Sequence, residues 1–242
     1  MDRSTPLRRT APGWLIGLLL LALGLQLVWK WHAPAPEVHP EDLGPPPASA
    51  LMRLSTLGDP VAVAIFWMLW LQTFDDQAGV TVSLQKMDYH HLAGWLERIL
   101  ELDPDSEYPL LAAIRVYGFV PEPQRQRRML DFVHRAFLQA PRNRWQWLTF
   151  AALQARHRLE DGRLARKYMD DLEKNIQTGQ LPFWVRGLHA RILYDQNELA
   201  GARTVIGGIL LHQQATDRQK LALGSWLERL EEAEKLPDSK KN

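Results

Sequence analysis

The chain has 242 residues, of which 24% are charged and 46% are apolar, and it contains no cysteine. The 29 basic and 28 acidic side chains nearly cancel, which excludes the strong overall positive charge of a typical nucleic-acid-binding domain. The lack of cysteine excludes disulfides, a catalytic thiol, thiolate metal sites and a lipid anchor attached to cysteine.

The N-terminal part predicts a membrane anchor. Residues 1–13 carry three arginines, and an apolar run with flanking tryptophans follows from Trp14 to Trp31. At about 1.5 Å per residue the run measures roughly 27 Å, close to the hydrocarbon core of about 30 Å, which predicts a transmembrane helix over 14–31. A cleaved signal peptide is the alternative, although Ala33-Pro34-Ala35 is a poor cleavage site. The arginines predict a cytoplasmic N-terminus and, for a bacterial inner-membrane protein, a periplasmic body.

The segment 32–49 contains the run Pro45-Pro46-Pro47 and few large apolar residues, which predicts a stiff, extended linker. A second apolar stretch, Val61 to Leu71, follows Asp59 and Pro60, which favour the start of a helix. It is too short to span a membrane. We therefore expect a buried core helix, or one packed against a partner or a membrane surface.

Beyond residue 50 the apolar residues recur at helical spacing, and no stretch alternates with a period of two. The fold class is predicted to be all-α, with a helical domain over 50–236 and a polar tail over 237–242. The expected helices lie near 50–57, 60–74, 87–102, 107–118, 124–139, 144–159, 162–176, 183–195, 198–212 and 217–235.

The helices show a degenerate repeat. Pro104 and Pro141 end two similar helices 37 residues apart, and Trp147 is followed four residues later by the small Ala151. This pattern resembles the tetratricopeptide repeat, with an aromatic residue on the first helix, a small residue at the helix contact and a proline after the second helix. The resemblance covers about 87–212 and implies a right-handed solenoid of helix pairs. The expected glycine between helices occurs only as Gly162.

The segments from LWLQTFDDQAG to WLTFAALQARHRL also resemble a group of uncharacterised bacterial membrane-anchored proteins with a repeat-like periplasmic body. That resemblance implies an architecture and no activity.

Motifs for catalysis are absent from the sequence. It has no HExxH, no glycine-rich phosphate loop and no GxSxG, and the pairs Asp75-Asp76 and Asp170-Asp171 are explained by solvated charge and helix ends. The histidines lack ligand spacing. The sequence therefore predicts no enzyme activity, no metal and no cofactor.

One segment is unusually basic. Between Arg115 and Asp170 the sequence contains twelve lysines and arginines and five acids, a local excess of seven positive charges. Such a block is commonly the solvated face of helices, and the functional interpretation is an anion-binding surface. The predicted function is a protein-protein interaction scaffold, an accessory or assembly subunit of an envelope complex. The alternative is a module that binds anionic lipid or polymer through the basic segment. No oligomeric state is predicted. The candidate partner-binding residues are Arg128, Arg142, Arg144, Trp145, Trp147 and Arg156.

Overall fold

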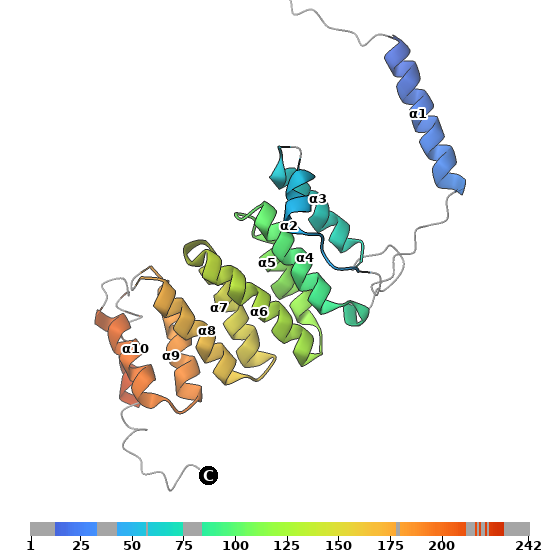
Figure 1. The fold of residues 1–242 in the computed structure, drawn as a ribbon. Coiled ribbons are helices and arrows are strands. Elements are labelled where there is room, and N and C mark those ends of the chain that lie inside the picture. Colours follow the sequence, from blue (N-terminus) through green and yellow to red (C-terminus); the bar gives the residue numbers. More distant parts are fainter. Residues whose placement is uncertain are drawn as a thin grey trace, which may run out of the picture. The chain divides into compact units, whose positions relative to one another are not determined.

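The computed structural model describes residues 13–32, 43–56, 58–74, 84–177, 180–211, 216, 218, 221 and 223–229. The described residues form helices, turns and irregular segments and no strand, so the all-α prediction is confirmed. The chain divides into two compact units, Met1–Val38 and His39–Asn242. The first unit contains one described helix and the second contains the helical body (Figure 1).

The helix of the first unit, α1, runs from Gly13 to His32. Among the described residues, no helix combines the length and the apolarity needed to cross a membrane, so the predicted transmembrane helix over 14–31 is wrong. Polar residues explain the correction: Gln26 and Lys30 interrupt the second half of the run. The apolar stretch before Gln26 measures only about 18 Å at 1.5 Å per residue, against a core of about 30 Å. The predicted location of the protein at the inner membrane does not follow from this helix alone and stays a prediction.

Most of the predicted N-terminal segment and the whole polar tail, 237–242, lie outside the described residues, as do residues 33–42 of the predicted linker. The end of that linker, residues 43–48, is an irregular segment that packs on the helical body. Its Leu43 side chain is only 1% exposed. We call residues 43–48 the N-terminal strap, because they lie against helix α4 of the body.

The helical body follows the predicted order with small shifts at the helix ends. Proline occupies the first turn of α3, α5, α6 and α7, where its missing N–H costs no hydrogen bond. The helices are α2 (Ser49–Leu54), α3 (Pro60–Gln72), α4 (Tyr89–Leu102), α5 (Tyr108–Arg115), α6 (Pro123–Gln139), α7 (Pro141–His157), α8 (Gly162–Asn175), α9 (Phe183–Asp195) and α10 (Leu199–Leu211). Two 3-10 turns lie at Leu84–Lys86 and Tyr117–Phe119, and residues 223–229 are helical as well.

The helices stack as successive antiparallel pairs. α4 contacts α6, and α5 contacts α7, so corresponding helices of neighbouring pairs lie side by side (Figure 1). Ala151, Ala152 and Ala155 of α7 are completely buried, and these small side chains let α7 approach α8 closely. At the end of the stack, Ala190, Ile206 and Leu223 belong to a separate apolar cluster. This architecture is compatible with a helical repeat.

Hydrogen bonds between neighbouring pairs join residues that are about one repeat apart. The Gln154 side chain donates to the carbonyl of Ile114, 40 residues earlier, at 2.7 Å. The Gln146 side chain donates to Glu107, 39 residues earlier, at 2.8 Å. These separations are close to the spacing of 37 that the prolines show in the sequence. Each helix pair therefore contacts mainly the neighbouring helix pairs, as in other helical repeats.

Candidate partner-binding groove

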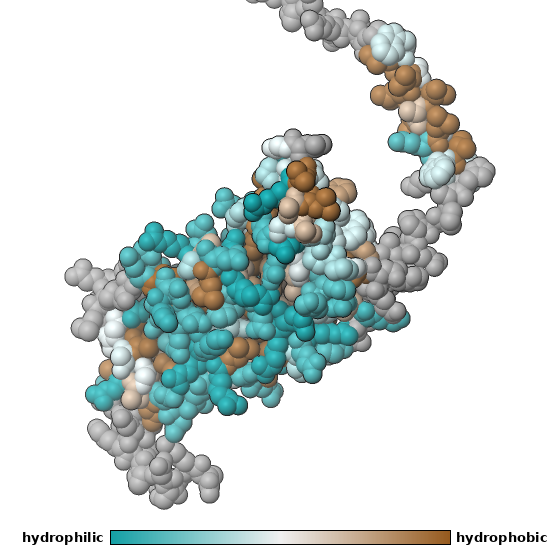
Figure 2. Space-filling view, in the orientation of Figure 1, coloured by the Kyte–Doolittle hydropathy of each residue, from teal (hydrophilic) through white to brown (hydrophobic). Residues whose placement is uncertain are grey.

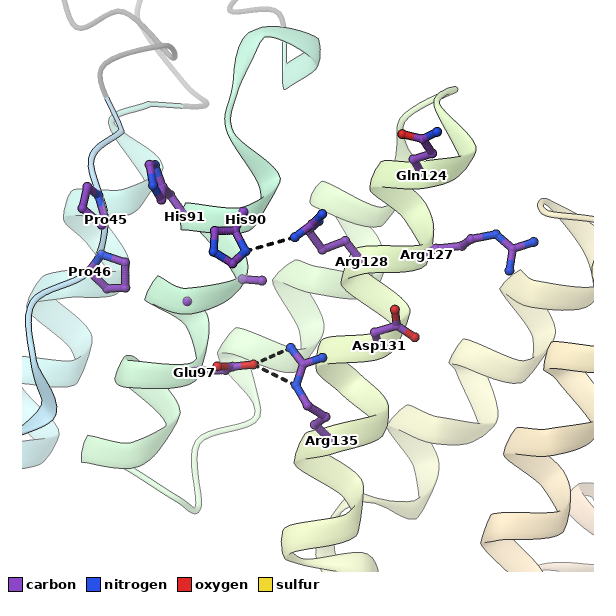
Figure 3. Close-up of a pocket in the computed structure, with 12 residues that line it drawn as sticks. Pro45, Pro46, His90, His91, Glu97, Gln124, Arg127, Arg128, Asp131 and Arg135 are labelled. Atoms are coloured by element: carbon purple, nitrogen blue, oxygen red, sulfur yellow. Dashed lines mark hydrogen bonds and ion pairs between the residues drawn. The ribbon is translucent and has the colours of Figure 1, made fainter.

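A groove of about 620 Å³ lies between α4 and α6 (Figure 3). Both helices are amphipathic, and their apolar faces turn into the core, with Leu92 and Leu96 from α4 and Met129 and Val133 from α6. Their polar faces therefore point outward and meet at this groove. We call it the α4–α6 groove, and its lining residues are Pro45, Pro46, His90, His91, Ala93, Gly94, Glu97, Gln124, Arg127, Arg128, Asp131 and Arg135.

The N-terminal strap forms one wall of the groove. The ring of His91 donates from Nδ1 to the carbonyl of Leu43 at 2.8 Å, and Trp95 Nε1 donates to the carbonyl of Gly44 at 2.9 Å. The ring of Pro46 lies over Gly94, where an added Cβ atom would stand 2.9 Å from Pro46 Cγ. The absence of a side chain at Gly94 therefore lets the strap pack close to α4 and gives the groove an apolar edge.

The opposite wall comes from α6 and carries three arginines with different partners. Arg135 forms an ion pair with Glu97 of α4, with Nε 3.0 Å from the carboxylate oxygen. Arg127 points toward the next helix pair and contacts Asp161 at 2.6 Å. Arg128 donates to Nδ1 of His90 at 3.0 Å (Figure 3). Among the described residues, Arg128 is the arginine of this wall whose guanidinium has no carboxylate partner.

A second hollow of about 400 Å³ continues the groove toward the N-terminus of α4. The two hollows share His90, Gln124 and Arg128, so Arg128 lies where they join. In the second hollow the guanidinium of Arg125 lies 5.4 Å from the ring centroid of Tyr89. The remaining lining residues are Lys86, Met87 and Asp88. Cations outnumber carboxylates along the joined groove, which favours an anionic ligand.

Asp161, the partner of Arg127, lies at the start of α8 and has a second role there. The carboxylate accepts a hydrogen bond from the backbone N–H of Leu164 at 3.0 Å and thereby caps α8. This hydrogen bond, together with the charge and hydrogen bond of Arg127, lowers the pKa of Asp161 below its ordinary value, although partial burial opposes the shift. Arg127 is thus engaged in holding one helix pair to the next.

Arg144 and Trp147 lie at a different hollow, of about 320 Å³, beside the turn 104–107. Arg144 is only 5% exposed and donates to the carbonyls of Ala136, at 2.8 Å, and Pro104, at 2.7 Å. Ala136 lies in the last turn of α6, where carbonyls lack partners within the helix. Burial lowers the pKa of the Arg144 guanidinium, and Asp105 opposes this shift. Arg144 therefore fastens a turn to the end of a helix.

The other candidates are dispersed. Trp147 is buried, whereas Trp145 is half-buried and its ring lies 6.2 Å from the ring of Trp184. Arg156 of α7 forms an ion pair with Asp195 of α9, and Arg142 is exposed at the start of α7. The structure therefore brings Arg144 and Trp147 together and places Arg128 in the α4–α6 groove. It does not gather the six predicted residues on one surface.

The basic excess between Arg115 and Asp170 is partly balanced by three acids that lie outside that stretch of sequence. Arg135 pairs with Glu97, Arg156 with Asp195, and Arg166 with Glu198. Each of these pairs joins one helix pair to its neighbour. A count within one stretch of sequence cannot include such partners, because they belong to adjacent repeats.

Asp170 and Asp171 contact histidines. His189 is buried and donates from Nε2 to Asp170 at 3.0 Å, while its Nδ1 lies 3.0 Å from Glu173. His134 Nε2 lies 2.7 Å from Asp171. These contacts hold α8 to its neighbours α6 and α9. Within the described part of the chain, no group of three histidine or carboxylate side chains could hold a metal ion.

His90, Glu97, Gln124 and Arg135 line the groove but were not predicted as site residues. The repeat itself carried a usable signal, because His90 and Arg128, and likewise Glu97 and Arg135, are separated by 38 residues. Residues at equal positions of successive repeats face each other across the boundary between them. Aligning α4 with α6 by the repeat spacing would have identified these pairs.

Comparisons of the chain with protein-family models, with curated proteins and with solved structures find no match. The helical repeat is therefore described from the contacts of this chain alone, and no functional residue is taken from another protein.

Proposed function

We propose that the chain is a scaffold of the tetratricopeptide type that binds an extended, acidic segment of a partner protein in the α4–α6 groove. The supporting observation is Arg128: its guanidinium lies where the two hollows join, and its contact there is with Nδ1 of His90, not with a carboxylate. A guanidinium binds a carboxylate through two parallel hydrogen bonds. Arg128 can therefore receive an acidic side chain without first losing a carboxylate partner among the described residues.

The shape of the groove favours an extended peptide. Its two joined hollows provide cationic side chains, and the prolines of the N-terminal strap provide an apolar edge. A peptide in which acidic and apolar residues alternate can place its carboxylates toward α6 and its apolar side chains toward Pro45 and Pro46. Binding, not catalysis, is the activity that this arrangement supports.

The test uses the full chain and a fluorescent peptide in which glutamate alternates with leucine, followed by fluorescence anisotropy. We expect Arg128→Glu to weaken binding at least tenfold, about 1.4 kcal/mol, because it removes an attraction and adds a repulsion. Arg142→Glu is the matched control, since Arg142 is exposed and lies outside the groove. Binding should also weaken as salt is added.

If Arg128→Glu and Arg142→Glu weaken peptide binding equally, binding in the α4–α6 groove is contradicted. The peptide would then be attracted only by the positive charge of the protein in general. The same peptide with glutamine in place of glutamate should not bind. If it binds as well as the acidic peptide, the proposed recognition of carboxylates is wrong.

The anionic lipid or polymer module is the second candidate, and the charge pairing between repeats weakens it. Arg127, Arg135 and Arg156 each contact a carboxylate, so the basic segment does not present a continuous cationic surface. Flotation with phosphatidylglycerol vesicles separates the candidates, because a lipid-binding surface would lose affinity with Arg142→Glu as well. The assignment to an envelope complex stays a prediction, and nothing in the proposal depends on it.

A further inference from the structure

The outer face of α3 is apolar and exposed. Val61, Ile65 and Leu69 recur every fourth residue, and their exposed fractions are 47%, 54% and 56%, while the neighbouring Phe66 is 58% exposed. Residues at this spacing form one ridge along a helix. Figure 2 shows hydrophobic side chains gathered over α2 and α3, whereas the surface of α4, α6 and α8 in that view is mainly hydrophilic.

The other side of α3 already has its packing partners. Ala64, Met68 and Leu71 are buried, and α3 packs on α4. Trp67 contacts Trp95 of α4, with ring centroids 5.1 Å apart. The exposed ridge is therefore a second apolar face of α3 and not a gap in the core of the body.

The position of this face at the end of the stack is unusual. In a helical repeat the terminal helices normally present a polar outer surface, because nothing stacks on them. Here α2 adds two further exposed leucines, Leu51 and Leu54. We define the N-terminal apolar face as Leu51, Leu54, Val61, Ile65, Phe66 and Leu69.

We propose that this face binds the same face of a second copy of the chain, with two α3 helices crossing at Ile65. The size fits: the six side chains are 47% to 76% exposed. At about 100 Å² each they offer roughly 600 Å² per chain, close to the roughly 800 Å² per partner of a standard interface. Two copies would then bury about 1,200 Å², the lower bound for a specific interface.

The chemistry of the face also fits a second copy. α3 contains no charged residue along its 13 positions, so two α3 helices can cross without bringing like charges of these helices together. Ridges of residues four apart pack into each other's grooves at a crossing angle of about 50°. Ile65 is the middle residue of the ridge, and a two-fold axis there that sets the two α3 helices antiparallel would pair Val61 of one copy with Leu69 of the other. This proposal is independent of the α4–α6 groove.

Light scattering after size-exclusion chromatography of the full chain tests the dimer. We expect the mass of two chains for the unchanged protein and the mass of one chain for Ile65→Lys. Because Ile65 is exposed, circular dichroism should show that the Ile65→Lys protein keeps the helix content of the unchanged protein. Arg163→Glu, at an exposed position of α8, is the control and should keep the mass of two chains.

A mass of one chain for the unchanged protein at all concentrations would overturn the proposal and would mean that a different partner covers the face. A dimer that survives Ile65→Lys would overturn it as well, because the association would then lie elsewhere in the chain.

The lack of cysteine permits a second test by disulfide trapping. Under mild oxidation, Ile65→Cys should form a disulfide-linked dimer, whereas Arg163→Cys should stay monomeric on a denaturing gel. A mixture of Val61→Cys and Leu69→Cys chains should link more efficiently than either chain alone. If Ile65→Cys and Arg163→Cys link equally, the linkage reflects random collision and the predicted axis is wrong.

Discussion

The hollow beside the turn 104–107 and the α4–α6 groove are both lined by arginines, but the arginines have different partners. Arg144 is buried and its donors are taken by two backbone carbonyls. Arg128 is exposed, and its guanidinium donates to the side chain of His90. An arginine in a helical repeat therefore belongs to the architecture when backbone carbonyls or the carboxylates of a neighbouring repeat use its donors. It is available for recognition when neither does.

Arg144→Ala gives the largest expected effect. The substitution leaves the carbonyls of Ala136 and Pro104 without their charged donor and opens a cavity beside Trp147. Because hydrogen bonds to charged groups contribute about 1.5–3 kcal/mol each, the free energy of unfolding should fall by about 3 kcal/mol. Urea unfolding measures it. Arg142→Ala, two residues away and exposed, should change the free energy by less than about 0.5 kcal/mol. Equal effects would remove the distinction between the two regions.

Gly94→Ala gives a smaller effect on the groove side. An alanine Cβ would stand 2.9 Å from Pro46 Cγ, so the N-terminal strap must move away from α4. We expect a loss of about 1 kcal/mol, since overpacking costs about 1–3 kcal/mol and the better helix propensity of alanine returns part of it. Gly187→Ala in α9 is the matched control, because nothing lies within 4 Å of its Cβ position. Gly187→Ala should raise the free energy of unfolding by about 0.5–1 kcal/mol. In thermal unfolding, the melting temperature should therefore rise for Gly187→Ala and fall for Gly94→Ala. A stabilised Gly94→Ala protein would show that the strap does not constrain the groove.

Asp161→Asn gives the smallest effect and depends on pH. Asparagine keeps the oxygen that caps α8 but loses the ion pair with Arg127, which is worth less than about 1 kcal/mol at such an exposed site. The folded state lowers the pKa of Asp161, so its charge stabilises the fold above the ordinary value of 3.8, and this contribution disappears as the pH falls through the lowered pKa. Urea unfolding between about pH 7 and pH 3 should show the two proteins converging toward acid. If the free energies of unfolding of the two proteins differ by the same amount at every pH in this range, the ion pair with Arg127 is not the cause of the difference.

Much of the helical order could be predicted from local signals. The predicted helix over 183–195 matches α9, and the prediction over 162–176 differs from α8 by one residue, because Pro182 and the Asp161-Gly162 turn mark their starts. The start of α7 was placed three residues late, since Pro141 begins this helix as well as following the previous one. The helix predicted over 107–118 ends early at Arg115, and a 3-10 turn follows at Gly118, where a Cβ atom would stand 2.6 Å from the carbonyl of Ala113.

The candidate site could not be predicted to the same extent, for a physical reason. Arg144 and Arg128 have the same chemistry in the sequence, and their roles are separated by the carbonyls of Ala136 and Pro104, the second of which is 40 residues from Arg144. The apolar stretch from Val61 to Leu71 was expected to be a buried helix or one packed on a partner, and the structure buries only one side of it. Periodicity identifies which residues share a helix face, but it does not say which of two apolar faces has a partner within the chain.

The N-terminal strap also has a mechanical meaning. The carbonyls of Leu43 and Gly44 accept hydrogen bonds from His91 and Trp95, which lie in the first half of α4. A force that pulls on the strap is therefore transmitted to α4 as well as to the short α2 helix that follows the strap. Two hydrogen bonds and the contact of Pro46 with Gly94 must be lost before such a force acts on α2 alone.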